Sequence, residues 1–273
     1  MSELPPKQAR MAIPCFRHSP CIDLAYYDIG AGEVLVLIHG LGANATAWRE
    51  QIGELSSSYR VIAMDLRGHG NSGHRPEGPI ALRTFADDLI ALFKGLGIRR
   101  AHFCGNSLGG LICLEIWVRA PSLLKSLTLV GTTAYFPPPQ ILEEFLHLFD
   151  HLEMTAWAGF MAPRLLSPLA PATLVEELIE MIGTVSREVY RQGLVVAFQA
   201  DFRWMLPLID IPTLIVVGED DQATPIGYAK FLARQIQGST LRLVPGAAHL
   251  PHREKPAEFN RLLRKHLEGC GRD

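Results

Sequence analysis

Short apolar runs alternate with amphipathic segments over most of the chain. Most of these runs are rich in valine, isoleucine and leucine and end at turn residues, which is typical of strands buried on both faces of a sheet. They predict strands at 34–38, 60–65, 101–104, 126–130, 213–217 and 240–244. Segments that fit helices occur between and after them, at 46–55, 84–96, 111–118, 226–236 and 256–267. This alternation predicts an α/β fold with a mostly parallel sheet and helices on both faces.

The alternation stops in the middle of the chain. Four helical segments fit the region between 135 and 206, at 140–150, 153–166, 172–183 and 187–200. Aromatic side chains give this region a large apolar surface. We therefore expect a helical cap at 135–206, inserted into a core formed by 1–134 and 207–273. The predicted wall of the substrate pocket consists of Phe136, Trp157, Phe160, Tyr190, Trp204 and Leu250.

Three local patterns complete this outline. Residues 1–13 are polar and contain prolines, which predicts a loose lead-in. Two β-prone pieces within 16–29, on either side of Ser19-Pro20, predict a hairpin. Thr84 is a residue type that favours the N-cap position, so we expect it to begin the helix over 84–96.

Composition and charge exclude several classes of partner. Of the 273 residues 48% are hydrophobic and 20% are charged, and the formal net charge is only −2. The sequence has no basic or acidic block, which argues against nucleic acid or an anionic membrane as a partner. The five cysteines are odd in number and form no C-x-x-C pair. Without a signal pattern or an apolar run of membrane length, we expect a cytoplasmic protein.

The segment Gly105-Asn106-Ser107-Leu108-Gly109 matches the G-x-S-x-G motif. It lies between the predicted strand at 101–104 and the predicted helix at 111–118, which is the context of a nucleophile elbow. Small residues two positions on either side of the serine allow the strand and the helix to approach each other. Ser107 is therefore the candidate nucleophile.

A serine nucleophile needs a base and an acid, and both occur at later strand ends. His249 follows the strand at 240–244, and Asp220 and Asp221 follow the strand at 213–217. Because the working residues of open α/β sheets gather at the carboxyl ends of the strands, these side chains are expected to meet Ser107. Position alone leaves the choice between the two aspartates open. We expect His252, in the same loop as His249, at the surface or in the pocket wall.

Two backbone amides are expected to form the oxyanion hole. One is the N–H of Leu108, which directly follows the nucleophile. The other is the N–H of Leu41, in the loop after the strand at 34–38. The sequence contains no H-E-x-x-H motif and no histidine–cysteine cluster, so it offers no support for a metal site.

Together these motifs resemble those of the α/β-hydrolase superfamily over about 26–267. The resemblance is carried by His39-Gly40 with Trp48, the turn Asp65-x-Arg67-Gly68-x-Gly70-x-Ser72, the elbow, and the loops Gly218…Asp221…Pro225 and Gly246-x-x-His249. The family pattern implies that Asp221 is the acid. Within the superfamily, 100–107 and 221–225 are similar to the same regions of 3-oxoadipate enol-lactonases and related small esterases. A lactone that bears a carboxylate calls for a pocket cation, and the cap carries Arg164, Arg187, Arg191 and Arg203.

We therefore expect a serine hydrolase that cleaves a small carboxylic ester or lactone through an acyl-enzyme and needs no cofactor. Two alternatives use the same residues. The dipeptide Asn106-Ser107 is similar to the elbow of C–C bond hydrolases that act on ring-cleavage products, although those tend to have tryptophan where this chain has Leu250. A sensor that turns its ligand over very slowly is the other alternative.

Overall fold

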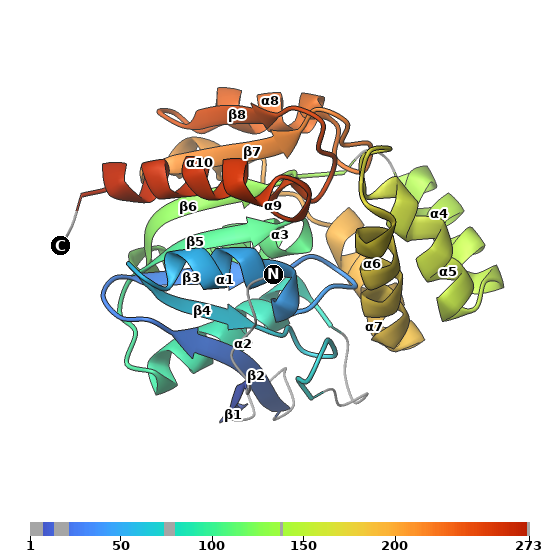
Figure 1. Cartoon of the computed structure of the whole chain (residues 1–273), viewed down its shortest axis with the longest axis horizontal. Coiled ribbons are helices and arrows are strands. Elements are labelled where there is room, and N and C mark those ends of the chain that lie inside the picture. Colours follow the sequence, from blue (N-terminus) through green and yellow to red (C-terminus); the bar gives the residue numbers. More distant parts are fainter. Residues whose placement is uncertain (1–7, 14–21, 74–79, 137–138, 272–273) are drawn as a thin grey trace.

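The computed structural model describes residues 8–13, 22–73, 80–136 and 139–271. Its strands form one sheet in the order β1-β2-β4-β3-β5-β6-β7-β8 (Figure 1). Pairing is antiparallel for β1–β2 and β2–β4 and parallel from β4 onward. The strands are β1 Ala9–Ile13, β2 Ile22–Ile29, β3 Val34–Ile38, β4 Arg60–Met64, β5 Ala101–Asn106, β6 Leu124–Val130, β7 Thr213–Gly218 and β8 Thr240–Val244.

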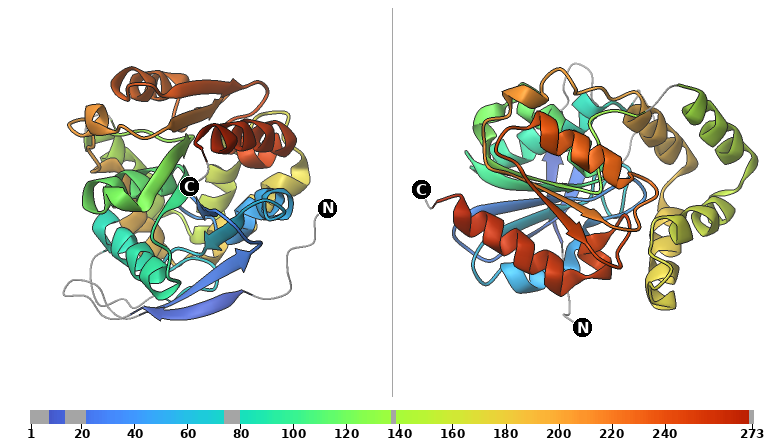
Figure 2. Two further views of the ribbon diagram at one scale, coloured as in Figure 1. Left: turned by 90° about the vertical axis from the view of Figure 1, so that its left-hand side faces the viewer. Right: turned by 90° about the horizontal axis from the view of Figure 1, so that it is seen from above.

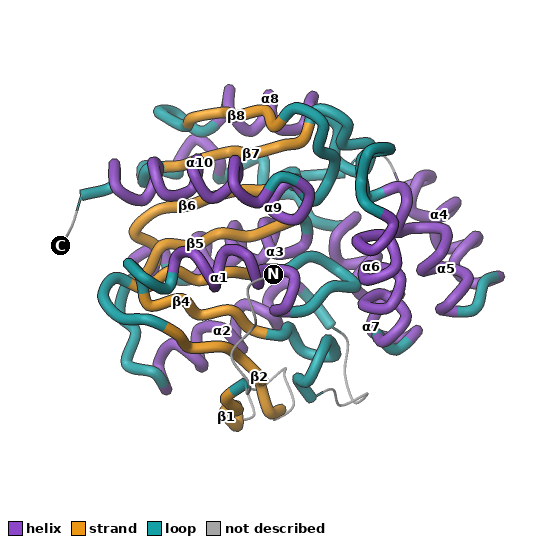
Figure 3. The backbone as a smooth tube through the Cα atoms, viewed as in Figure 1, coloured by secondary structure: helices purple, strands orange, loops and turns teal. Residues whose placement is uncertain are grey.

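The sheet is covered by helices on both faces, as Figure 3 shows. Apolar side chains of α1 (Arg49–Leu55) and α10 (Pro256–Gly269) pack on one face. Those of α2 (Leu82–Gly95), α3 (Leu108–Arg119) and α8 (Ile226–Gln235) belong to the larger core on the other face. Every residue of β5, β6 and β7 is buried, because these central strands have a helix layer on each side. The predicted fold class is therefore confirmed.

Four further helices lie together beyond the carboxyl ends of the parallel strands (Figures 1 and 2). They are α4 Pro139–His151, α5 Met154–Met161, α6 Ala172–Thr184 and α7 Arg187–Phe198. The two ends of this segment meet, since Tyr135 and Asp201 form an isolated antiparallel bridge and Phe202 N donates to Ala134 O at 2.8 Å. We propose 135–206 as a cap on this basis.

Short helical turns complete the described chain. Two of them lie within the proposed cap or at its end, two lie next to α1 and α10, and one lies between α3 and β6. They are η1 Ala45–Trp48, η2 Pro121–Leu123, η3 Ala162–Arg164, η4 Leu206–Leu208 and α9 Pro251–Glu254.

The amino-terminal prediction was wrong in one respect. Residues 9–13, expected in a loose lead-in, form the edge strand β1, whose partner β2 occupies the second part of the predicted hairpin. Ala9, Arg10 and Ala12 are exposed, so this strand lacks the strong apolar alternation that marks a half-buried strand. The first β-prone piece of the predicted hairpin lies outside the described residues.

Several helix boundaries also differ from the prediction, and two of them have a visible local reason. The helix expected to start at Thr84 begins at Leu82, and Ala81 is its N-cap. Thr84 Oγ1 instead accepts a hydrogen bond from Ala81 N at 3.3 Å, from inside the first turn. The helix predicted at 153–166 ends at Met161 and continues as the short 3-10 turn η3, where Pro163 follows.

Candidate active site

Ser107 occupies the sharp turn between β5 and α3. Its backbone angles are φ 53° and ψ −117°, and it is the only non-glycine residue of the described chain with positive φ. This conformation is costly for a residue with a Cβ atom and persists only where the surroundings enforce it. Ser107 N donates to Val130 O at 2.9 Å, and Ser107 O accepts from Thr132 Oγ1 at 2.8 Å. Neighbouring strand β6 thus holds the turn from one side.

The glycines on either side of the serine are required by close backbone contacts. A Cβ atom on Gly105 would overlap the carbonyl oxygen of Gly109, and one on Gly109 would overlap the carbonyl oxygen of Ile38. The beginning of α3 therefore lies directly against the ends of β3 and β5. This packing projects Ser107 into the space between the sheet and the proposed cap.

The structure pairs His249 with Asp221 rather than with Asp220. His249 Nδ1 lies 3.0 Å from Asp221 Oδ2 and 3.2 Å from Oδ1, and both residues are buried. Asp220, one residue earlier, is exposed. The loop after β7 thus turns only the second aspartate toward the histidine, which makes Asp221 the candidate acid.

The Asp221 carboxylate is held by its own loop. Oδ1 accepts from Ala223 N at 2.9 Å and from Thr224 N at 2.8 Å, while Thr224 Oγ1 donates to Oδ2 at 2.9 Å. Burial alone would raise the pKa of Asp221, but the charge and hydrogen bond of His249, with the hydrogen bonds from Thr224, outweigh it and lower the pKa. The group is therefore an ionised carboxylate aimed at the imidazole.

Two neighbours, for which the sequence patterns indicated no positioning role, hold the loop of His249. Asn106 Nδ2 donates to His249 O at 3.1 Å, which ties this loop to the elbow. Glu254 accepts from Ala248 N at 2.8 Å and from Ser167 N at 2.7 Å, which ties it to the cap segment. An acidic residue five positions after a candidate histidine is too common to have been a usable signal.

The amides proposed for the oxyanion hole are those of Leu41, in the loop after β3, and of Leu108, the first residue of α3. Among the described residues, neither Leu41 N nor Leu108 N donates to a protein acceptor, and both residues line the same cavity as Ser107. His39 Nε2 accepts from Leu66 N at 2.9 Å, so its proton is on Nδ1, which donates to Gly40 O at 2.8 Å. Burial lowers the pKa of His39 to about 4, so the ring stays neutral and keeps both hydrogen bonds.

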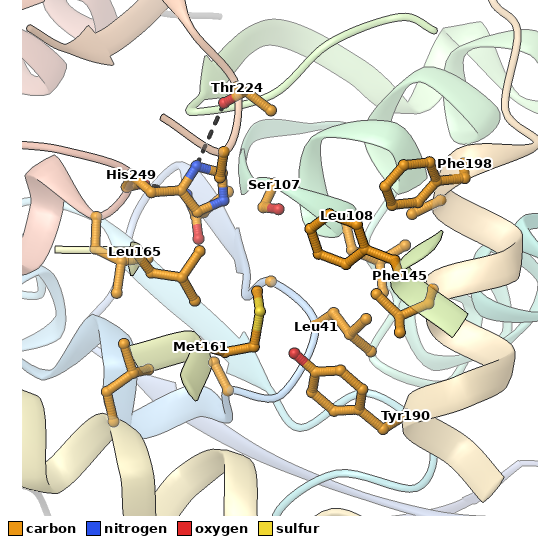
Figure 4. Close-up of a pocket in the computed structure, with 18 of the residues that line it drawn as sticks. Leu41, Ser107, Leu108, Phe145, Met161, Leu165, Tyr190, Phe198, Thr224 and His249 are labelled. Carbon is orange, nitrogen blue, oxygen red and sulfur yellow. Dashed lines mark hydrogen bonds between the residues drawn. The ribbon is translucent and has the colours of Figure 1, made fainter. Parts of the chain in front are cut away.

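A cavity of about 130 Å³ joins these groups (Figure 4). Ser107 and His249 lie on the same side of it, and the opposite side is formed by apolar side chains and by Tyr190. Apart from His249, no described residue that lines the cavity has a side chain that can be charged near neutral pH. The lining residues are Gly40, Leu41, Ala43, Asn106, Ser107, Leu108, Phe136, Phe145, Met161, Leu165, Leu178, Tyr190, Leu194, Ala197, Phe198, Ala223, Thr224, His249 and Leu250.

A family model described as the alpha/beta hydrolase family matches residues 35–262. The chain belongs to this family. It is 31% identical to 3-oxoadipate enol-lactonase 2 of Acinetobacter baylyi over 89% of this chain and 92% of that protein. A thermophilic esterase from Thermogutta terrifontis has a TM-score of 0.89 and 28% identity, with 97% of this chain and 99% of that chain covered. The enol-lactonase from Burkholderia xenovorans has a TM-score of 0.85 and 26% identity, with 90% and 97% covered.

These comparisons confirm the predicted resemblance to the superfamily and to its enol-lactonase and esterase members. The chain is accordingly a hydrolase of the alpha/beta hydrolase family. Within the described residues, no helix is both long and apolar enough to cross a membrane. The same part of the chain contains no group of three His, Cys, Asp or Glu side chains arranged to hold a metal ion.

Three residues of the predicted pocket wall do not line the cavity of this hydrolase. Trp157 is fully buried in the cap, where its ring packs edge-on against Phe149. Phe160 lies under the guanidinium of Arg164, and Trp204 is 64% exposed. Aromatic character alone did not separate the cavity face of a helix from its other faces. The other three predicted wall residues, Phe136, Tyr190 and Leu250, do line the cavity.

Three lining residues that we did not predict lie beside Tyr190 on α7. Tyr190, Leu194, Ala197 and Phe198 follow one another at helical spacing, so they lie on one face of the helix, and all four line the cavity. Once Tyr190 is placed in the pocket, this spacing would have found the other three. Phe145, Met161, Leu165 and Leu178 come from different segments and share no such pattern.

None of the four cap arginines reaches the cavity. Arg187 donates to the carbonyl oxygens of Phe149 and Leu152, and Arg164 donates to that of Phe160. Arg191 pairs with Asp150, and Arg203 pairs with Asp201. His252, expected at the surface or in the pocket wall, is instead buried and stacked on Trp48, with ring centroids 4.1 Å apart.

Proposed function

We propose that this hydrolase cleaves small, neutral carboxylic esters or lactones through an acyl-enzyme on Ser107. The observation that carries the proposal is the buried pair of Asp221 and His249, with 3.0 Å between carboxylate and imidazole, at a cavity that Ser107 also lines. A serine hydroxyl attacks a carbonyl only when a base takes its proton, and the base needs an acid to fix its tautomer. All three functions have a candidate residue here.

In the first half of the reaction His249 takes the Ser107 proton as Oγ attacks the carbonyl carbon. The carbonyl oxygen becomes an oxyanion, which the N–H groups of Leu41 and Leu108 stabilise. Asp221 stabilises the imidazolium that forms. When the tetrahedral intermediate collapses, the bond to the leaving oxygen breaks and His249 returns the proton to that oxygen, which leaves an acyl group on Ser107.

In the second half a water molecule replaces the alcohol. His249 takes a proton from the water as its oxygen attacks the acyl carbon, and the same amides stabilise the second oxyanion. Collapse of this intermediate breaks the bond to Ser107 Oγ, which regains its proton from His249. The products are one carboxylic acid and one alcohol, or one hydroxy acid from a lactone.

The wall of the cavity supports a neutral substrate. An unpaired carboxylate in a desolvated site is costly, and the described residues of the lining include neither lysine nor arginine to pair with it. A lactone of 3-oxoadipate, after which the relative from A. baylyi is named, retains a carboxylate. We therefore propose a mostly apolar ester or lactone for this chain rather than that compound.

Hydrolysis of p-nitrophenyl butyrate by Ser107→Ala tests the proposal. We expect kcat to fall by about 10³-fold or more, because the nucleophile is lost while the cavity remains. Ser57→Ala, at an exposed serine, is the matched control and should keep the wild-type rate. Full activity of Ser107→Ala would contradict the proposal, as would failure of a p-nitrophenyl phosphonate to label Ser107.

The same assay separates the proposal from its alternatives. Turnover of a vinylogous diketone at a higher kcat/KM than any ester would favour C–C bond hydrolysis on the same residues. Release of a single equivalent of product from every compound would favour a slow sensor. Multiple turnovers on neutral esters would support the hydrolase proposed here.

A further inference from the structure

The hydroxyl group of Tyr190 is a polar atom in an otherwise apolar part of the cavity. Tyr190 extends from α7 and lies across the cavity from His249, and its hydroxyl points toward the cavity interior (Figure 4). The residue is only 2% exposed. Its labelled neighbours on that side, Leu41 and Met161, have apolar side chains. The proposed catalytic groups therefore face a second polar point across an apolar space.

The Tyr190 ring is held in place by three contacts. Phe149 stacks on it with ring centroids 5.7 Å apart, and Trp157 meets it edge-on at 6.0 Å. On the side of the sheet, Gly42 has φ +80°, and a Cβ atom there would lie 2.8 Å from Tyr190 Cε2. The loop that carries the Leu41 amide thus leaves room for this ring, and the hydroxyl has a defined position relative to the proposed oxyanion hole.

The hydroxyl is available as a hydrogen-bond donor to a ligand. Burial raises the pKa of Tyr190 to about 12, so the phenol keeps its proton. The nearby indole N–H of Trp157 can only donate, so it cannot accept that proton. Within the described chain no residue accepts a hydrogen bond from Tyr190. A ligand acceptor at this point can therefore form a hydrogen bond with this donor in an apolar part of the cavity.

We propose that Tyr190 selects substrates that carry a second, uncharged oxygen acceptor remote from the scissile carbonyl, such as an ether, a ketone or a second ester. This inference rests on the function proposed above. The scissile carbonyl lies at Ser107 and the oxyanion amides, the apolar middle of the substrate fills the cavity, and the remote oxygen accepts from Tyr190. A charged carboxylate is disfavoured at the same point, because a phenol supplies one hydrogen bond and no countercharge.

A double comparison, in which both the enzyme and the substrate are changed, tests this assignment. Wild type and Tyr190→Phe are assayed on p-nitrophenyl hexanoate and on esters of equal chain length in which an ether oxygen replaces one methylene, at position 3, 4 or 5 of the acyl chain. The readout is the loss of kcat/KM in the variant on each ether ester, divided by its loss on hexanoate. This ratio cancels both the inherent reactivity of each ester and any general effect of the substitution.

For at least one ether position the ratio should reach about fivefold to tenfold, the effect of one neutral hydrogen bond in a desolvated site. Tyr228→Phe removes a hydroxyl outside the cavity lining and should leave the ratio near one. A ratio near one for Tyr190→Phe at every ether position would show that the tyrosine only fills space, and would overturn the inference.

Failure of the proposed function has a different signature. It would appear as no hydrolysis of any ester by the wild type, or as full activity of Ser107→Ala. In that event dissociation constants are measured instead of kcat/KM. Ser107→Ala is compared with the double variant Ser107→Ala/Tyr190→Phe, and the ligands are 2-octanone and its ether analogues. A preference for an ether analogue that disappears with Tyr190→Phe would support the inference, and equal affinities would refute it.

Discussion

Asn106, the residue before the proposed nucleophile, donates a hydrogen bond from Nδ2 to the carbonyl oxygen of His249, the proposed base, at 3.1 Å. The same amide group donates to Val130 O at 3.1 Å. One buried side chain thus connects the elbow, the end of β6 and the loop after β8. The hydrogen bond relates the histidine loop to the serine turn although 143 positions separate the two residues.

Asn106→Ala should lower kcat about tenfold or more while KM changes less. The substitution leaves His249 O and Val130 O without their shared donor and loosens the histidine loop relative to Ser107, and misplacement of a base affects the transition state more than binding. Steady-state kinetics on a p-nitrophenyl ester measure the effect. Asn71→Ala, at an exposed asparagine, is the control, and an equal effect of both substitutions would contradict this role.

Asp221→Asn should lower kcat by about 10³–10⁴-fold on p-nitrophenyl butyrate, whereas Asp220→Asn should change it less than about twofold. The amide of asparagine can donate to His249 Nδ1, which stabilises the tautomer that cannot take the Ser107 proton. Asp220 is exposed and does not contact His249, so it is a matched neighbour. Comparable losses in the two variants would show that the acid is assigned to the wrong residue.

Gly109→Ala should destabilise the fold by more than about 3 kcal/mol, because the added methyl overlaps the carbonyl oxygen of Ile38. Gly159→Ala is the matched control. Its new methyl group meets nothing within 4 Å at an exposed position of α5, so the substitution should be neutral or add up to about 1 kcal/mol of stability. Urea unfolding of both variants measures the difference. Equal midpoints would show that β3 and α3 are not packed as closely as described.

His39 should destabilise the fold progressively as the pH is lowered from 6.5 toward 4. Its pKa is about 4 in the fold, below the ordinary value of about 6.5, so between these values the unfolded chain binds more protons. His39→Gln removes this titration and should lose about 2 kcal/mol less than wild type between pH 7 and pH 5.

Urea unfolding at both pH values tests the His39 prediction. His147→Gln, at an exposed position, should follow the wild type. The comparison between variants is needed because burial also lowers the pKa of His252 and of His266, the latter to about 4, so the wild-type slope contains several protons. Parallel losses in His39→Gln and wild type would refute the assignment of a neutral, buried His39.

Most of the sheet could be predicted because its central strands are apolar on both faces. The runs at 126–130 and 213–217 are the clearest cases, and both belong to fully buried strands in the structure. Strand β1 could not be predicted in this way. It is a short edge strand with exposed residues, and its pairing with β2 depends on backbone hydrogen bonds, which leave little trace in the side-chain pattern.

The candidate site shows the same division between local and long-range information. The sequence by itself placed Ser107, Asp221 and His249 after strands, and the carboxyl ends of parallel strands meet at one edge of a sheet whatever the remaining residues are. Position along the chain left the choice between Asp220 and Asp221 open, because both follow shortly after the strand, and only the resemblance to the family implied Asp221. Only the turn of the folded loop buries one carboxylate against His249 and exposes the other.

The wall of the cavity was decided by the tertiary structure. Trp157 and Phe198 are both aromatic residues on cap helices, yet the first packs inside the cap and the second lines the cavity. A helix with apolar residues on more than one face does not specify which face meets a neighbouring helix and which meets a ligand. That choice depends on how the cap helices pack against one another and against the sheet. Short local motifs in the sequence were therefore enough to predict the proposed catalytic residues, whereas the shape of the cavity that would hold the substrate is set only by the folded structure.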